Sequence, residues 1–295
     1  MLHCFIINPQ ARRGSASQLI RSLEEALRAH RMDYRIVASE KGGQATELAR
    51  DAVAQGAEAV VAVGGDGTVN EVLNGLGAET RFGILPVGTC NDIASNLGLP
   101  VKDWRAALDI IAAGHTMQAD VGRCGERRFL SVAAIGLDSE VGMAFRRLPR
   151  LLRCRAAYTL LLFLKLMTQR PSMFRLTLNG KTIERNVWLV AVANTACYGG
   201  GMRIAPRARP DDGRLHVCIV GDGPRREIIR SFPLVYRGEH VTHPMVRMFE
   251  TREIHISSSM ATPIIADGEH FGWLPASLAV EPQALAVFAP RVTRP

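Results

Sequence analysis

Paired cysteines, aromatic residues and nucleotide-binding signatures of the commonest kinds are scarce or absent in this sequence. The six cysteines are scattered, with no Cys-x-x-Cys spacing and no pattern of a disulfide framework. Buried free thiols and a reducing compartment are therefore expected. Aromatic residues make up 6% of the chain and nowhere interleave with basic residues. This excludes the usual pattern of a nucleic-acid-binding surface, so we expect no nucleic-acid partner.

No apolar run is long enough to cross a membrane. Residues 145–169 begin with several arginines and continue as Ala-Ala-Tyr-Thr-Leu-Leu-Leu-Phe-Leu-Lys-Leu-Met. A spanning helix needs ~20 apolar residues, and Lys165 interrupts this run. Two interpretations stay open: a helix packed on its own domain, or a basic apolar surface that rests on an anionic membrane and admits a lipid. The N-terminus is too short and uncharged for a signal peptide, so we expect a cytoplasmic protein, peripherally associated with the inner face of the membrane.

Length and charge set broad limits on what the chain does. Its 295 residues suit two domains of ordinary size or one large domain, and an apolar fraction of 47% is enough for real cores. The net charge of +8 favours anionic partners such as nucleotide phosphates or an anionic membrane surface.

The first part of the chain alternates predicted strands and helices. This alternation predicts a Rossmann-like, three-layer α/β domain over residues 1–118, with a parallel sheet and helices on both faces. The predicted strands are 2–7, 34–38, 59–63 and a short one at Phe82, and the predicted helices are 17–30, 44–54, 68–76 and 104–113.

Strand-like runs dominate after residue 118. They predict a mainly antiparallel, β-sandwich-like domain over residues 119–295, and the last strand is left free to return to the first domain. The predicted strands are 129–135, 174–178, 187–193, 215–220, 253–257, 278–280 and 285–288.

A glycine-rich turn follows the predicted strand at 59–63. It reads Gly64-Gly65-Asp66-Gly67-Thr68. The glycines let a ligand approach the main chain, and Thr68 is interpreted as the cap of a helix whose N-terminus suits a phosphate. Asp66 would repel a bare phosphate, so a metal that bridges phosphates is one role for it. The spacing is neither that of a P-loop nor Gly-x-Gly-x-x-Gly, and a tight turn without a ligand is the alternative.

Other polar or glycine-rich segments end neighbouring strands. Asn8, Ser39 and the run Gly88–Asn91 fall, with the Gly64 turn, at the carboxyl ends of the predicted strands. In a parallel sheet these ends meet at one edge, where ligands bind. We therefore expect four loops to converge there.

Two further segments in the second half carry carboxylates. Gly199-Gly200-Gly201 allows close backbone approach, and Asp211-Asp212-Gly213 could hold a hard cation. Asp267-Gly268-Glu269 follows a buried-looking strand, where a carboxylate could accept the proton of a substrate hydroxyl. Ordinary hairpin turns are the alternative for both acidic segments.

Taken together, and in this order along the chain, these motifs resemble the diacylglycerol-kinase-type lipid kinases, especially the bacterial soluble members, which are related to sphingosine and ceramide kinases. The resemblance runs from Asn8 nearly to the C-terminus. It implies an ATP- and Mg²⁺-dependent kinase that phosphorylates the hydroxyl of a lipid such as diacylglycerol. It also implies that the nucleotide lies in a cleft between the two domains.

The resemblance also implies roles for individual residues. Glu269 would accept the proton with Asp267 beside it, although Asp66 is a second candidate for the base. Ser39 differs from the usual threonine but keeps the hydroxyl. Residues implied at the nucleotide are Asn8, Ser39, Gly64, Gly65, Asp66, Gly67, Thr68, Glu71, Gly88, Thr89 and Asn91. Residues implied at Mg²⁺ are Asp212 with the main-chain oxygens of Arg209 and Arg214, and, through water, Asp66, Asp92 and Asp120.

Alternatives to a lipid kinase stay open at this point. NAD kinases also carry Gly-Gly-Asp-Gly-Thr, and a lipid- or nucleotide-binding regulator without catalysis would keep the same motifs. The sequence does not identify the lipid that would accept the phosphoryl group. Diacylglycerol, phosphatidylglycerol, a sphingoid base and a polyprenyl alcohol all carry a hydroxyl on an apolar molecule. A homodimer is left open.

Overall fold

The computed structural model describes residues 1–9, 16–149, 152 and 155–291. The sequence predicts a basic, glycine-containing turn at residues 11–15, and this turn lies outside the described residues. So do Arg150 and Arg153, two of the arginines at the start of the segment 145–169. The chain divides into two compact units, one made of Met1–Asp120 with Gln283–Pro295 and the other of Val121–Pro282. Residues from 283 onward thus group with the first unit.

The first unit is a parallel α/β sheet. Its strands lie in the order β4-β3-β1-β2, and the end of β15 joins β4 in parallel at Val287 and Phe82. The strands are β1 (Leu2–Ile7), β2 (Asp33–Ala38), β3 (Ala59–Gly64) and β4 (Arg81–Pro86), and the helices are α1 (Ala16–Ala29), α2 (Gln44–Ala54), α3 (Asp66–Leu73), α4 (Asp92–Asn96) and α5 (Trp104–Ala113).

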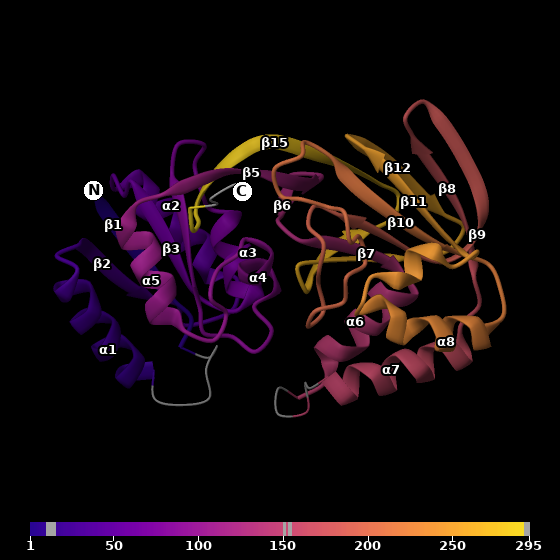
Figure 1. The fold of residues 1–295 in the computed structure, drawn as a ribbon, viewed down its shortest axis with the longest axis horizontal. Helices are drawn as coiled ribbons and strands as arrows, with labels where there is room; N and C mark the ends of the chain where they lie inside the picture. Colours follow the sequence, from indigo (N-terminus) through magenta and orange to yellow (C-terminus); the bar gives the residue numbers. More distant parts are fainter. Residues whose placement is uncertain (10–15, 150–151, 153–154, 292–295) are drawn as a thin grey trace. The chain divides into compact units, whose positions relative to one another are not determined.

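Successive side chains of a strand point to opposite faces of the sheet, and in β3 both sets are apolar and buried. Helices therefore cover both faces of this sheet. Phe5 and Val61 pack with Leu23 of α1 and Leu108 of α5 on one face. The contacts that α2 makes with β1 and α3 makes with β3 cover the other face (Figure 1). The predicted three-layer α/β class is confirmed.

The start of α3 differs from the prediction. We expected a helix over 68–76 capped by Thr68, but α3 begins at Asp66 and ends at Leu73, so the cap assignment is wrong. Gly65 is the N-cap, in an extended conformation and without a capping side chain. Asp66, Gly67 and Thr68 therefore form the first helical turn rather than a loop.

The second unit is mainly antiparallel, as predicted. Its strands follow the order β14-β13-β7-β9-β8-β12-β15, with β10 between β9 and β11. Two strands, β5 (Thr116–Cys124) and β15 (Ala276–Phe288), belong partly to each unit. The other strands of the second unit are β6 (Arg127–Phe129), β7 (Val132–Gly136), β8 (Ser172–Leu178), β9 (Lys181–Ala193), β10 (Leu215–Gly221), β11 (Val246–Thr251), β12 (Glu253–Ser258), β13 (Pro263–Ala266) and β14 (Glu269–Trp273).

Alternating side chains of β9 show how this unit is layered. Val190 and Val192 enter a large core with residues of β8, β10 and β12, whereas Ala191 and Ala193 join a smaller core on the opposite face. Three helices pack near one another in this unit (Figure 1): α6 (Leu137–Arg147), α7 (Arg155–Thr168) and α8 (Arg225–Val235). Leu137, Leu166 and Ile228 bring them together around Trp188.

Several elements of the second unit depart from the predicted ones. The strand expected at 129–135 breaks at Leu130-Ser131, because both amides turn to the Asp267 carboxylate. The strands expected at 278–280 and 285–288 are one strand, β15. The sequence did not indicate α8, which contains Pro233, and gave no strand for β5, β11 or β14.

Candidate active site

The strand ends of the first unit converge as expected. Asn8, just after β1, donates from Nδ2 to the Thr68 Oγ1 at 3.3 Å. The amide of Ser39, just after β2, donates to the Ile7 carbonyl at 2.8 Å, and the Ser39 side chain is buried. A side-chain hydrogen bond thus links the end of β1 to the turn after β3. A backbone hydrogen bond links the end of β2 to the end of β1.

Two glycines bring the turns after β3 and β4 into backbone contact. A Cβ on Gly88 would lie 2.4 Å from the Cα of Gly65, so no larger residue fits at Gly88. Asn91 stabilises this turn, with its side-chain amide bonded to both the N–H and the carbonyl of Gly88 at 3.1 and 3.0 Å. Its φ of 55° lies in the left-handed region that asparagine tolerates. The glycines are required by loop packing, whether or not a ligand also approaches them.

The acidic residues of this edge accept hydrogen bonds from helix amides. Asp66 Oδ1 accepts from the Ile93 amide at 3.0 Å, in the first turn of α4. Glu71 accepts from the Ala45 amide at 3.3 Å, in the first turn of α2. A carboxylate at a helix N-terminus is stabilised by the helix dipole. Asp66 and Glu71 therefore hold α4 and α2 in place, and their contact with metal or nucleotide stays a prediction.

Asp92 and Asp120 occupy buried positions. Asp92 is the first residue of α4. Asp120 is completely buried, and its Oδ1 accepts from the Gln283 amide at 2.8 Å. This bond fixes Gln283, which has a left-handed backbone conformation in the middle of β15. Their predicted water-mediated link to Mg²⁺ also stays a prediction.

The exposed part of this edge suits an anion. The first turn of α3 has no side-chain cap, so its amide dipoles point out of the helix past Gly65. Thr89 is exposed on the neighbouring turn and adds a hydroxyl. The Thr68 hydroxyl lies directly over Gly64, since a Cβ on that glycine would come within 2.4 Å of it. Thr68 is buried, so the exposed donors of this edge are the uncapped amides of α3 and the Thr89 hydroxyl.

In the second unit, Asp267 and Glu269 have different environments. Asp267, at the β13–β14 turn, is buried, and its two carboxylate oxygens accept from the amides of Leu130 and Ser131, both at 2.8 Å. Glu269 opens β14, has a side chain that is 29% exposed, and pairs with Arg146 at 2.8 Å. Only Glu269 is accessible enough to meet a substrate, and Asp267 holds its turn.

Asp212, the carboxylate of the predicted Mg²⁺ site, is surrounded by hydrogen-bond donors, and its contact with an ion stays a prediction. Its carboxylate accepts from the main-chain N–H groups of Arg214 and Arg209, at 3.0 and 3.3 Å, and contacts the His216 ring at 2.9 Å. Within the described ranges, no three His, Cys, Asp or Glu side chains are arranged to hold a metal ion. We therefore derive no catalytic step through an ion at this turn.

A buried polar cluster that the sequence did not indicate lies at the start of α6. Asp138 accepts hydrogen bonds from the hydroxyls of Tyr158 in α7 and Tyr198 before the glycine triplet, the latter at 2.6 Å. The triplet has φ values of 60°, 80° and 98°, and it folds the chain back so that Tyr198 pairs with Met202. The glycines thus shape the loop that carries Tyr198.

Burial controls the chemistry of this cluster. Burial raises the pKa of the Asp138 carboxyl, and the hydrogen bonds from the two tyrosines lower it in part. Burial, followed by the charge of Asp138, raises the pKa of both phenols well above the usual range. The tyrosines therefore stay protonated as donors, and Asp138 is a polar group at the edge of an otherwise apolar region.

An apolar cavity adjoins the cluster, with a free volume of about 60 Å³. This is room for roughly two water molecules, so a larger ligand would have to displace side chains. The buried Nδ1 of His240 has no hydrogen-bond partner among the described residues, and burial lowers the pKa of this ring. Residues of α6, α7, α8 and the strands behind them line the cavity, among them Leu162, Leu189, Val220, Phe232 and Met245.

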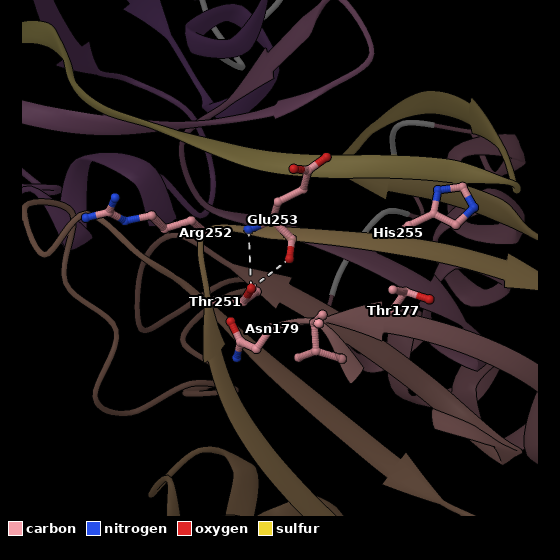
Figure 2. Close-up of a pocket in the computed structure, with 8 residues that line it drawn as sticks. Thr177, Asn179, Thr251, Arg252, Glu253 and His255 are labelled. Carbon is pink, nitrogen blue, oxygen red and sulfur yellow. Dashed lines mark hydrogen bonds between the residues drawn. The ribbon is translucent and has the colours of Figure 1, made fainter. Parts of the chain in front are cut away.

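A second depression lies at the other end of the unit and contains none of the predicted site residues. It is open, with a volume of about 450 Å³, and lies beside the β8–β9 turn (Figure 2). Thr251 and Glu253 bond to each other along its floor, and Asn179 donates to the Glu250 carbonyl at 2.8 Å.

Comparison with known proteins decides the family. Residues 3–124 match the model of the diacylglycerol kinase catalytic domain, and residues 131–289 match the YegS C-terminal NAD kinase beta sandwich-like domain. The diacylglycerol kinase of Mycobacterium tuberculosis (strain H37Rv) is 34% identical over 293 residues, which cover 97% of this chain and 94% of that protein. The chain belongs to the diacylglycerol kinase family.

Other members of the diacylglycerol kinase family agree with this assignment. The diacylglycerol kinase of Staphylococcus carnosus is 32% identical over 261 residues, covering 86% of this chain and 84% of the relative. A diacylglycerol kinase structure from Bacillus anthracis shares the fold, with a TM-score of 0.77 at 21% identity over 99% of this chain and 98% of that one. The predicted family is confirmed, and the chain is a lipid kinase, a phosphotransferase.

Proposed function

We propose that this enzyme transfers the γ-phosphoryl group of MgATP to the hydroxyl of a lipid such as diacylglycerol. The observation that carries the proposal is the presence, in one unit, of an apolar cavity with a polar end and of an accessible carboxylate, Glu269, at a strand end. Such a unit would bind a substrate that has an apolar body and one reactive hydroxyl. Family membership supports this reading over an NAD kinase.

The first unit would bind the nucleotide. The uncapped first turn of α3 and the exposed hydroxyl of Thr89 would offer donors for phosphate oxygens. Mg²⁺ would arrive with ATP as part of the substrate and neutralise charge on the phosphates. Phosphoryl transfer depends mostly on such positioning and charge neutralisation.

The second unit would supply the acceptor and the base. The lipid hydroxyl oxygen forms a bond to the γ-phosphorus while the bond from that phosphorus to the β–γ bridging oxygen breaks, leaving ADP. The hydroxyl proton passes to the Glu269 carboxylate. We assign the base to Glu269 because both oxygens of Asp267 are already bound to buried amides.

The cavity assignment predicts the effect of filling it. Val220 lines the cavity and is only partly buried, so Val220→Phe should fold and narrow the space for an acyl chain. We expect the apparent KM for the lipid to rise at least about tenfold, which corresponds to about 1.4 kcal/mol of lost binding, with KM for ATP unchanged. Ile183→Phe, an enlargement at a partly buried residue of β9 outside the cavity, is the control. Equal lipid KM values in the two variants would contradict the assignment.

We further propose that α7 rests on an anionic membrane. Its outer side exposes Leu160, Phe163, Leu164 and Met167, each between 46% and 60% exposed. Within the described part of the chain, no helix is both long and apolar enough to span a bilayer. An exposed apolar helix on a protein of net charge +8 suits the surface of anionic lipids.

This membrane proposal predicts weaker vesicle binding after polar substitution. The triple change Leu160→Ser, Phe163→Ser and Leu164→Ser should reduce cosedimentation with anionic vesicles by about tenfold or more, because buried apolar area contributes roughly 1.5–3 kcal/mol per large side chain. Neutral phosphatidylcholine vesicles control for the electrostatic part of binding. Unchanged binding of the variant to anionic vesicles would contradict the proposal.

A radiochemical assay tests the proposed function as a whole. The full chain is incubated with MgATP labelled in the γ-position and a panel of lipids in mixed vesicles, with NAD in a separate reaction. We expect label in an extractable lipid. ATP binding without transfer to any lipid would favour the regulator, and label in NADP would favour an NAD kinase.

A further inference from the structure

An arginine of α6 holds the carboxylate that we propose as the base. The Nη1 atom of Arg146 lies 2.8 Å from Glu269 Oε2 and also donates to the Gly268 carbonyl at 2.6 Å. Both side chains are about one-third exposed, at 37% and 29%, so the pair is neither fully solvated nor fully buried. One nitrogen thus contacts both the turn and the side chain that follows it.

The packing of α6 explains why Arg146 reaches this far. Gly142 lies one helical turn before Arg146 and faces β13, where an added Cβ would come 3.3 Å from Ile265 Cγ1. Residues four apart lie on the same helix face, so Arg146 is brought to the end of the same hairpin. Gly142 lets α6 approach β13, and the long side chain of Arg146 extends past β13 to Glu269.

The backbone of the hairpin is already held by other groups. Asp267 bonds to two amides on the chain between β6 and β7. Arg127 of β6 donates to the His270 carbonyl at 2.6 Å and stacks over Phe271 at 3.9 Å. The turn therefore does not depend on Arg146 alone. Among the described contacts, Arg146 alone forms a direct ion pair with the Glu269 side chain.

We infer that Arg146 is a positioning residue that holds the Glu269 side chain in place until the acceptor hydroxyl arrives. This inference rests on the proposed function, in which Glu269 accepts the proton. The charged or titratable groups around Glu269 are Arg146 from α6, Arg127 from β6, Asp267 from the turn and His270 from β14. An ion pair fixes the direction of a carboxylate, and a base must be held within reach of the hydroxyl whose proton it accepts.

Arg146→Gln is the informative variant. We expect kcat for lipid phosphorylation to fall roughly 10- to 100-fold, with KM for ATP unchanged, because the carboxylate loses its fixed geometry. The loss should fall on kcat alone, with KM for the lipid also unchanged. Arg146→Lys keeps the positive charge and should restore most of kcat. Arg175→Gln, which breaks the exposed Arg175–Glu184 pair of 2.6 Å, is the matched control.

The outcomes separate this inference from the proposed function. If the unmodified enzyme labels no lipid, the proposed function fails before Arg146 is tested. If the enzyme is active and Arg146→Gln leaves kcat unchanged, the inference is overturned. A lower Tm with an unchanged kcat also overturns it, because Arg146 would then only tie α6 to the hairpin. In a Glu269→Gln background, adding Arg146→Gln should lower kcat no further.

Discussion

Replacing Glu269 by glutamine is expected to lower kcat for lipid phosphorylation by about 10²- to 10⁴-fold, the usual contribution of a positioned base. Glutamine has nearly the same shape but cannot accept the hydroxyl proton at neutral pH. Because Glu269 is partly exposed and does not enter the core, folding and KM for ATP should be unchanged. Steady-state kinetics with lipid and ATP varied in turn would measure both constants, and circular dichroism would check the fold.

Asp66→Asn is the comparison that decides between the two candidate bases. Asparagine keeps an oxygen that can accept from the Ile93 amide, so α4 should stay in place. With Glu269 as the base, we expect the larger loss of kcat in Glu269→Gln. A loss of kcat in Asp66→Asn that exceeds the loss in Glu269→Gln would transfer the role of base to Asp66.

Replacing Asp267 by alanine is expected to destabilise the second unit by about 2–4 kcal/mol. The change removes two hydrogen bonds of 2.8 Å to a buried carboxylate and leaves the amides of Leu130 and Ser131 without their acceptor. The corresponding fall in Tm is on the order of 10 °C for a unit of this size. Scanning calorimetry measures it, and activity should fall as well because the turn before Glu269 loosens.

Asp267→Asn and Asp51→Ala complete this series. Asparagine keeps one of the two acceptor oxygens, so its Tm should fall between those of the unmodified protein and the alanine variant. Asp51 is an exposed residue of α2, and its replacement should change stability by less than about 0.5 kcal/mol. Equal Tm values for Asp267→Ala and Asp51→Ala would show that the buried carboxylate does not hold the turn.

The fold of the first unit could be predicted because its signals are local. The strand at 59–63 is a continuous apolar run, and the alternation of such runs with helices fixes a parallel sheet. The meeting of Asn8, Ser39, Gly65 and Gly88 at one edge follows from that topology. The boundary of α3 was misplaced because an extended glycine, rather than the threonine, begins the helix.

The second unit was less predictable because its decisive contacts join distant residues. The break between β6 and β7 depends on Asp267, more than a hundred residues away, so no local pattern at Leu130 indicates it. Asp138 meets Tyr158 and Tyr198, which lie 20 and 60 residues further along the chain. No motif spacing connects these three residues. The apolar stretch around Tyr158 indicated only that an apolar helix lies in this part of the chain.

The sequence identified the carboxylates but not their partners. The resemblance to lipid kinases marks Asp66, Asp212 and Asp267 as site residues, yet in the structure each accepts from backbone amides. A motif indicates which residue types recur, whereas the direction of a side chain depends on the donors that surround it. Arg146 had no motif at all, although it contacts Glu269 directly.

Transfer of label from γ-labelled MgATP to diacylglycerol in anionic vesicles tests the central claim most directly. The proposed function predicts labelled phosphatidic acid with the unmodified chain, and a loss of about 10²-fold or more with Glu269→Gln under the same conditions. The account would be contradicted if no lipid of the panel, diacylglycerol included, became labelled, or if Glu269→Gln transferred label as fast as the unmodified chain.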